Sequence, residues 1–157
     1  MGSEFNILLA EDNSDDVFLM EQAFKRAGGE GKLFAVCDGT EALAYLRGEG
    51  QYQDRFAFPL PDTLLLDLNM PRTSGYEVLE QVRGDPQLRR LIIHVLTGSA
   101  READVQRAYD LGANDYFVKP NRIDDLVAFV RALHAWHGMV RRAPLGEANS
   151  PAPLRVS

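Results

Sequence analysis

The chain has 157 residues, 45% of them hydrophobic, and its 17 Lys and Arg against 23 Asp and Glu give a net charge of −6 at pH 7. This length and apolar content are typical of one folded domain and exclude an intrinsically disordered chain. The negative charge disfavours general binding to nucleic acid, and no apolar run reaches the ~18 residues that a membrane-spanning helix needs.

The cysteine content and the N-terminus both indicate a cytoplasmic protein. Cys37 has no second cysteine with which to form an internal disulfide, which is typical of a reducing compartment. The first residues lack the basic and apolar regions of a secretory signal. We therefore expect a cytoplasmic protein without nucleic-acid or membrane partners, and we assign residues 1–4 to an N-terminal extension or tag.

Short apolar runs alternate with amphipathic stretches along the chain. The runs predict strands over 5–10, 32–36, 63–68, 91–96 and 116–118. The stretches that follow them predict helices over 14–27, 40–47, 74–83, 101–111 and 123–140. Strands that are apolar on both faces are typical of a parallel sheet covered by helices, so five strand–helix repeats predict a three-layer α/β/α domain.

Polar residues mark the boundaries of these elements. Ser14 and Ser74 stand at expected helix N-caps, and Gly28 and Gly112 at expected helix ends. The longest irregular stretch, residues 48–61, separates the second helix from the third strand. A proline-rich segment follows the last helix, so we assign 5–140 to the domain and 141–157 to a flexible tail.

Charged and small polar residues follow four of the five predicted strands. They are Glu11 and Asp12 after the first strand, Asp67 at the end of the third, Thr97 and Gly98 after the fourth, and Lys119 after the fifth. Ligands of open parallel sheets bind beyond the carboxyl ends of the strands, so these residues are expected to meet.

Their chemistry predicts phosphoryl transfer. Three carboxylates at one sheet edge repel one another, a conflict that Mg²⁺ removes while it also binds phosphate oxygens and water. Lys119 and Thr97 suit the phosphoryl group itself, as a point charge and a hydroxyl donor. Each segment alone has a simpler interpretation as a turn or a helix cap. Their joint order, each at the end of its own strand, favours transfer onto or near Asp67.

Four motifs give the chain its resemblance to a known family. They are LLAEDN at 8–13, LLLDLNMP at 64–71, LTGS at 96–99 and GANDYFVKP at 112–120. With them the chain resembles a bacterial response-regulator receiver domain from about Phe5 to Val140. The resemblance implies a CheY-like, flavodoxin-like (βα)5 fold with a five-stranded parallel sheet in the order 2-1-3-4-5. The long stretch 48–61 also resembles the stand-alone receivers that accompany bacterial phytochromes.

The resemblance implies a single-domain response regulator of a two-component phosphorelay. A sensor histidine kinase, in the narrower resemblance a bacteriophytochrome, phosphorylates Asp67. The protein is then a signalling phosphoacceptor that assists its own phosphorylation and autodephosphorylation, and not an enzyme with a separate substrate. A receiver fold that serves only as a phosphate sink or a non-switching scaffold remains the alternative.

The resemblance also implies a role for each matching residue. Mg²⁺, for which Mn²⁺ substitutes, is held by Glu11, Asp12, Asp67 and the backbone carbonyl of Asn69. The phosphoryl-contact and switch residues are Lys119, Thr97, Gly98 and Tyr116. The Lys119–Pro120 bond is expected to be cis. Glu11 departs from the commoner aspartate and reaches one methylene further, so a water between it and the metal is one expectation.

Two surfaces are predicted to bind partners. Phe129, Leu133, Trp136 and Val140 form a second apolar stripe on the last helix, which predicts homodimerisation through the side made by helix four, strand five and helix five. Phosphorylation is expected to switch the surface of strands four and five and helices four and five for dimerisation or partner binding. The other interpretation is that helix four or the tail covers this stripe. On the first helix, the resemblance places kinase docking at Asp15, Leu19 and Gln22.

Two other functions on the same architecture are disfavoured. A flavin-binding protein needs a phosphate loop after the first strand, where Glu11 and Asp12 would repel the flavin phosphate. An aspartate-nucleophile phosphatase commonly needs an acid two residues after its nucleophile, and that position is Asn69.

Overall fold

The computed structural model describes residues 5–29 and 31–142, with side chains as far as Met139. The strands are β1 (Asn6–Ala10), β2 (Lys32–Val36), β3 (Thr63–Leu66), β4 (Ile92–Thr97) and β5 (Asp115–Val118). The helices are α1 (Ser14–Ala27), α2 (Gly39–Arg47), α3 (Gly75–Gly84), α4 (Glu102–Asp110) and α5 (Ile123–Arg142), with a short 3₁₀ turn at Gly50–Tyr52.

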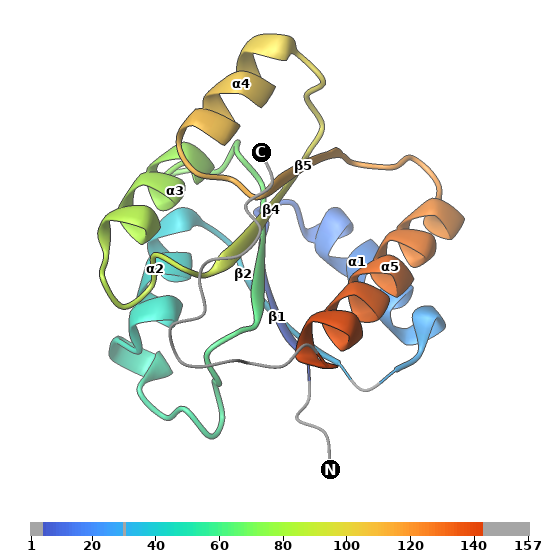
Figure 1. The fold of residues 1–157 in the computed structure, drawn as a ribbon, viewed down its shortest axis with the longest axis horizontal. Coiled ribbons are helices and arrows are strands. Elements are labelled where there is room, and N and C mark those ends of the chain that lie inside the picture. Colours follow the sequence, from blue (N-terminus) through green and yellow to red (C-terminus); the bar gives the residue numbers. More distant parts are fainter. Residues whose placement is uncertain (1–4, 30, 143–157) are drawn as a thin grey trace.

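The five strands form one parallel sheet in the order β2-β1-β3-β4-β5, which confirms the predicted fold. Figure 1 shows α1 and α5 packed together on one face of the sheet, and α2 and α3 on the other. No helix in the described ranges is long and apolar enough to cross a membrane.

The alternation of side chains along the strands divides the core into two layers. In β1, Ile7 and Leu9 point into the layer beneath α1 and α5, whereas Leu8 and Ala10 point into the layer beneath α2, α3 and α4. All four are buried, because helices cover both faces of a parallel sheet. The edge strands β2 and β5 are less covered than the central strands, and Phe117 and Val118 of β5 are exposed.

Helix capping follows the sequence with one correction. The N-cap of α1 is Asn13 and not Ser14, because the Asn13 Oδ1 accepts the backbone N–H groups of Asp15 and Asp16. Ser74 is the N-cap of α3, as predicted, and forms a reciprocal capping box with Glu77.

The ends of other elements also differ from the prediction. β3 ends at Leu66 and not at 68, because the Leu68 carbonyl turns to accept the N–H of Gly75 at 3.0 Å. α5 continues to Arg142, so 141–142 belong to the helix and not to the tail, since the first proline after the start of α5 is Pro144. The extension 1–4 and the tail from 143 onward lie outside the described residues.

The long stretch 48–61 is tied to α2. The Arg55 guanidinium donates to the carbonyls of Tyr45 and Leu46, each at 2.8 Å, and to that of Phe58 at 3.2 Å. These bonds satisfy carbonyls at the C-terminus of α2, which have no partner within the helix. Tyr52 adds to this attachment, because its ring packs in the core and its hydroxyl donates to Glu41 at 2.5 Å.

Gly75, the first residue of α3, lies close against the backbone of the loop after β3. A Cβ atom at this position would lie 2.7 Å from the Leu68 Cα and closer still to the Asp67 carbonyl oxygen. We predict that Gly75→Ala lowers the free energy of unfolding by about 1–3 kcal/mol, because the loop after β3 must move to admit the methyl group.

Gly84 in the same helix provides the control, because a Cβ there would meet no atom within 4 Å. Gly84→Ala should leave the free energy of unfolding unchanged or raise it by up to about 1 kcal/mol. Urea denaturation of both variants checks the prediction, and an equal loss of stability in both would contradict it.

Candidate functional site

Three carboxylates meet at the carboxyl edge of the sheet. Glu11 and Asp12 directly follow β1, and Asp67 directly follows the neighbouring strand β3. One oxygen from each of the three lies within 4.8 Å of the others. Glu11 and Asp67 are 3% and 6% exposed, whereas Asp12 is open to solvent. The fold therefore brings together the three acids that the sequence motifs identified.

Backbone pairing positions these acids. The Glu11 N–H donates to the Val36 carbonyl at 3.0 Å, and the Asp67 N–H donates to the Ala10 carbonyl at 3.1 Å. Each carboxylate then accepts a backbone N–H two residues further on, from Asn13 at 3.1 Å and from Asn69 at 3.2 Å. The side chains are therefore fixed by the ends of the strands and by the turns that follow.

The site carries more negative charge than its surroundings neutralise. The pKa of Glu11 is raised to about 7, chiefly by burial and in part by the charge of Asp67, against the hydrogen bond from Lys119, which lowers it. A buried acid with such a pKa favours a bound proton or a cation. Because all the donors are oxygen atoms, the cluster fits a hard divalent cation such as Mg²⁺.

Lys119 supplies the positive charge of the site. Its Nζ lies 2.7 Å from Glu11 Oε1, 2.8 Å from Asp16 Oδ2 and 3.4 Å from Asp67 Oδ2. Burial lowers the pKa of Lys119, but hydrogen bonds to Asp16 and Glu11 outweigh it and raise the pKa above its ordinary value. The ammonium therefore stays charged beside Asp67.

Asp16 is a site residue that the motifs did not reveal. It lies in the first turn of α1, which begins three residues after Glu11, and so stands at the same edge of the sheet. An acidic first turn is common in helices because it favours the helix dipole. The sequence therefore indicated that Asp16 lies at the start of a helix, but it did not indicate the contact of Asp16 with Lys119.

The predicted switch residues lie on β4, β5 and the loop after β4. Thr97 is fully buried, and its Oγ1 has no hydrogen-bond partner among the described residues. Gly98 is exposed, and a Cβ there would meet nothing within 4 Å. Tyr116 is half-buried, and its hydroxyl donates to the Ser99 carbonyl at 2.9 Å. A buried hydroxyl without a partner leaves Thr97 free to bind a further group.

A network of polar side chains fixes this loop to α3 and α4. Asp104 accepts from the Ser99 hydroxyl at 2.5 Å and from the Tyr76 hydroxyl at 3.2 Å, and the Ser99 bond is the main reason that the pKa of Asp104 is lowered. The Arg107 guanidinium lies 3.9 Å above the Tyr76 ring. Ala108 is the buried residue of α4, so these polar contacts largely determine where that helix sits.

The loop after β3 presents Asn69 and is held against the N-terminus of α2. Arg72 in this loop has φ 66°, a left-handed conformation that is uncommon for residues other than glycine, and its guanidinium lies 3.6 Å from the buried Asp38. The Thr40 and Thr73 hydroxyls are 3.0 Å apart. No sequence motif predicted these contacts.

One prediction at the site is wrong. No described residue has a cis peptide bond, so the Lys119–Pro120 bond is trans. The cis form was expected from the resemblance alone, and trans is the ordinary preference of bonds that precede proline.

The predicted dimer stripe is only partly exposed. Leu133 is 5% exposed and belongs to the core beneath α1 and α5, so its assignment to an interface is wrong: the residue faces the sheet. Phe129 is half-buried with its ring centroid 5.0 Å from that of Phe117. Trp136 is exposed, and the side chain of Val140 lies outside the described residues. The exposed apolar side chains on this side are Tyr109, Phe117, Val118, Trp136 and Met139.

The predicted kinase-docking residues lie on the surface of α1. Asp15 is exposed, Leu19 is 43% exposed and Gln22 is half-buried. Phe18 beside them is 57% exposed, and it was not predicted. An exposed phenylalanine next to an exposed leucine makes this surface more apolar than the sequence pattern indicated.

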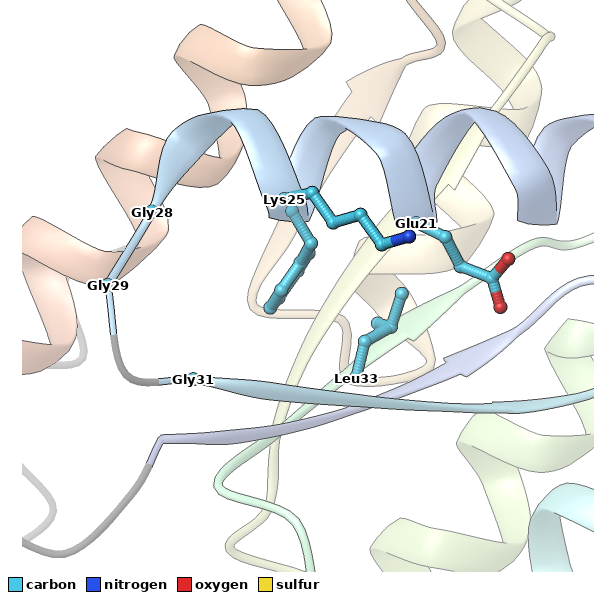
Figure 2. Close-up of a pocket in the computed structure, with 7 residues that line it drawn as sticks. Glu21, Lys25, Gly28, Gly29, Gly31 and Leu33 are labelled. Atoms are coloured by element: carbon cyan, nitrogen blue, oxygen red, sulfur yellow. The ribbon is translucent and has the colours of Figure 1, made fainter.

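A groove elsewhere on α1 does not share this chemistry. It lies between the C-terminal half of α1 and the start of β2, and Figure 2 shows Glu21 and Lys25 above Leu33. Its other lining residues are Phe24 and three glycines. The groove is at the amino end of β2, opposite the edge that holds Asp67, and its two charged side chains are exposed.

Comparison with known proteins agrees with the geometry. The model of the response regulator receiver domain matches residues 7–131. The response regulator Rcp1 from Synechocystis sp. is 35% identical over 83% of this chain and 86% of its own length. A solved Mn²⁺-bound form of Rcp1 has a TM-score of 0.74 at 33% identity over 94% of this chain and 99% of that one.

Two further solved structures are similar. The phosphorylated cyanobacterial phytochrome response regulator RcpA has a TM-score of 0.77 at 36% identity, over 85% of this chain and 94% of that one. A response regulator in red light signaling of R. palustris has a TM-score of 0.79 at 34% identity, over 96% and 99% of the two chains. With the acidic cluster, the lysine and the sheet order already described, these matches show that the chain belongs to the response-regulator receiver domains of two-component signalling.

Proposed function

We propose that this protein is a single-domain response regulator that accepts a phosphoryl group on Asp67 from a sensor histidine kinase. The observation that carries the proposal is the joint position of Asp67, two further acids and the Lys119 ammonium at the carboxyl edge of the sheet. Receiver domains take phosphoryl groups from sensor kinases, and the family match supports the same role here. The phytochrome-associated relatives favour a bacteriophytochrome as the kinase.

In the proposed reaction, an Asp67 carboxylate oxygen attacks the phosphorus of a phosphohistidine. The new P–O bond forms as the P–N bond breaks, and the imidazole leaves with the bonding electron pair. Lys119 offsets negative charge on the transferring oxygens from a position 3.4 Å from Asp67. Catalysis then consists mainly of positioning and electrostatic stabilisation.

A divalent cation fits the acidic cluster. Glu11, Asp12, Asp67 and the Asn69 backbone carbonyl would hold Mg²⁺, and the Mn²⁺-bound form of the relative Rcp1 supports Mn²⁺ as a substitute. The cation would neutralise charge on the acids and on the phosphoryl oxygens. The proximity of Glu11 to the other acids favours its direct participation, although it is longer than aspartate by one methylene.

The response to phosphorylation would begin at Thr97. Its buried hydroxyl lacks a partner among the described side chains, so a phosphoryl oxygen on Asp67 would supply one. A movement of Thr97 and Gly98 would reach Ser99, whose carbonyl and hydroxyl bind Tyr116 and Asp104. The exposed side chains of α4, β5 and α5 lie beyond this network.

We place the remaining functions on two surfaces. The α1 surface with Asp15, Phe18, Leu19 and Gln22 would dock the kinase. The α4–β5–α5 surface would form a homodimer, with Trp136, Phe117 and Val118 in place of the buried Leu133. Residues 5–142 would form the receiver domain, in the cytoplasm and without a nucleic-acid partner.

Labelling with a small phosphodonor tests the proposed function. Acetyl phosphate with Mg²⁺ should phosphorylate the wild-type protein on Asp67, as located by mass spectrometry, because Asp67 lies in the acidic cluster with the Lys119 ammonium 3.4 Å away. Asp67→Asn should lose this label. Equal labelling of Asp67→Asn, or a label on another residue, would refute the assignment.

The free energy of unfolding, measured with and without Mg²⁺, tests the assignment of the metal ligands. Mg²⁺ at a hundredfold excess over its Kd should raise the free energy of unfolding by about 2.7 kcal/mol, because it binds only the folded cluster. Asp12→Asn should lose most of this increment, since one ligand charge is removed. Glu21→Gln, an exposed acid on α1 outside the cluster, is the control and should retain it. An unchanged increment in Asp12→Asn would contradict the assignment.

The dimer surface can be tested by light scattering with and without acetyl phosphate. Phosphorylated wild type should have the mass of a dimer, and Val118→Glu on β5 should remain a monomer because it places a charge on the exposed apolar surface. Ala35→Glu, an equal change on the opposite edge strand β2, should still dimerise. A monomeric wild type in both states would favour the phosphate sink over the dimeric switch.

A further inference from the structure

The Lys119 ammonium contacts three carboxylates. An ammonium has three donors, and the Lys119 Nζ faces Glu11 at 2.7 Å, Asp16 at 2.8 Å and Asp67 at 3.4 Å. Glu11 and Asp67 belong to the acidic cluster that fits a divalent cation, and Asp16 does not. Of the three partners, Asp16 is therefore the one that neither a cation nor a phosphoryl group would engage.

The position of Asp16 is fixed by the start of α1. Its backbone N–H donates to the capping Asn13 Oδ1 at 3.1 Å, and the side chain extends from the first helical turn toward the end of β5. Asp16 and Lys119 are 103 residues apart in the sequence, so their contact connects α1 with the loop after β5. The Lys119 side chain is 23% exposed, which leaves it partly open to water.

We propose that Asp16 is a positioning residue that keeps the Lys119 ammonium beside Asp67 while a divalent cation and a phosphoryl group occupy the site. The inference rests on the proposed function, because it concerns the same phosphoryl transfer. A cation that binds Glu11 and Asp67 competes with Lys119 for their oxygens. Lysine is a flexible point charge on a four-carbon stem, so without a fixed partner it would leave the transferring oxygens for solvent.

The contact with Asp16 also accounts for the geometry at Asp67. Lys119 lies closer to Glu11 and Asp16 than to Asp67, so Asp67 is the least engaged of the three carboxylates. Asp16 draws the ammonium to one side and thus leaves an Asp67 oxygen available for attack. The same contact keeps the positive charge within reach of the oxygens that leave with the phosphoryl group.

The first experiment measures the rate constant for phosphorylation by saturating acetyl phosphate with Mg²⁺. Asp16→Ala should lower this rate constant about tenfold, since Lys119 loses its position, and Asp16→Asn, which retains an acceptor oxygen, should lower it less. Asp125→Ala is the matched control. Asp125 holds the same third position of its helix, in α5, and its removal changes the charge equally.

A double-mutant cycle separates action through Lys119 from a merely structural effect. In a Lys119→Met background, Asp16→Ala should cause no further loss of rate, because the side chain that it positions is gone. Urea denaturation of each variant shows whether it is folded. If Asp16→Ala does not fold, Asp16→Asn takes its place in the double-mutant cycle. An equal effect of Asp16→Ala in both backgrounds, or an effect equal to that of Asp125→Ala, would overturn the inference.

The second experiment does not depend on phosphorylation. With Mg²⁺ bound and no phosphodonor, the ¹⁵N ammonium signal of Lys119, identified by its absence in Lys119→Met, should persist in wild type and Asp125→Ala. It should disappear through rapid exchange with water in Asp16→Ala. A signal that persists in Asp16→Ala would overturn the inference even if Asp67 is phosphorylated. A wild type that is not labelled on Asp67 would instead refute the proposed function.

Discussion

The repulsion among Glu11, Asp12 and Asp67 is the constraint on which the rest of the site depends. Two of these acids are almost fully buried, and the pKa of Glu11 is raised to about 7, chiefly by burial and in part by the charge of Asp67. Backbone bonds from the strands hold the acids in place, and the Lys119 ammonium compensates only part of the charge. The remaining charge gives the site its affinity for a cation and, through the cation, for a phosphoryl group.

The same edge is surrounded by loops whose positions depend on polar contacts. The loop after β3 is held against α2 through Arg72, Asp38 and the two threonine hydroxyls, and the loop after β4 is held through Asp104 and Tyr76. Polar contacts between partly exposed groups are individually weak, so these loops can change position at modest cost, whereas the apolar layers beneath the sheet cannot. A rigid sheet with adjustable loops suits a protein that must respond to one added group.

Much of the fold and the site followed from the sequence. The alternation of apolar runs and amphipathic stretches predicted the strands, the helices and the three layers, because helices cover both faces of a parallel sheet. The motif residues at the strand ends gave Glu11, Asp12, Asp67 and Lys119, because parallel strands bring their carboxyl ends to one edge. The errors were local: the N-cap of α1 is Asn13, β3 ends at Leu66, α5 continues to Arg142 and the Lys119–Pro120 bond is trans.

Contacts between distant segments were decided only by the tertiary structure. From the sequence alone, Asp16 is an ordinary acid in the first turn of a helix. Tyr76 and Asp104 are likewise ordinary polar residues on two helices. Their roles arise because packing brings α1 to the end of β5 and α3 to α4. Leu133 was assigned to a surface because its spacing fits two faces of α5, and the sheet buries it. Sequence periodicity determines which face of an element is apolar, but the neighbour that each side chain meets depends on how the elements pack.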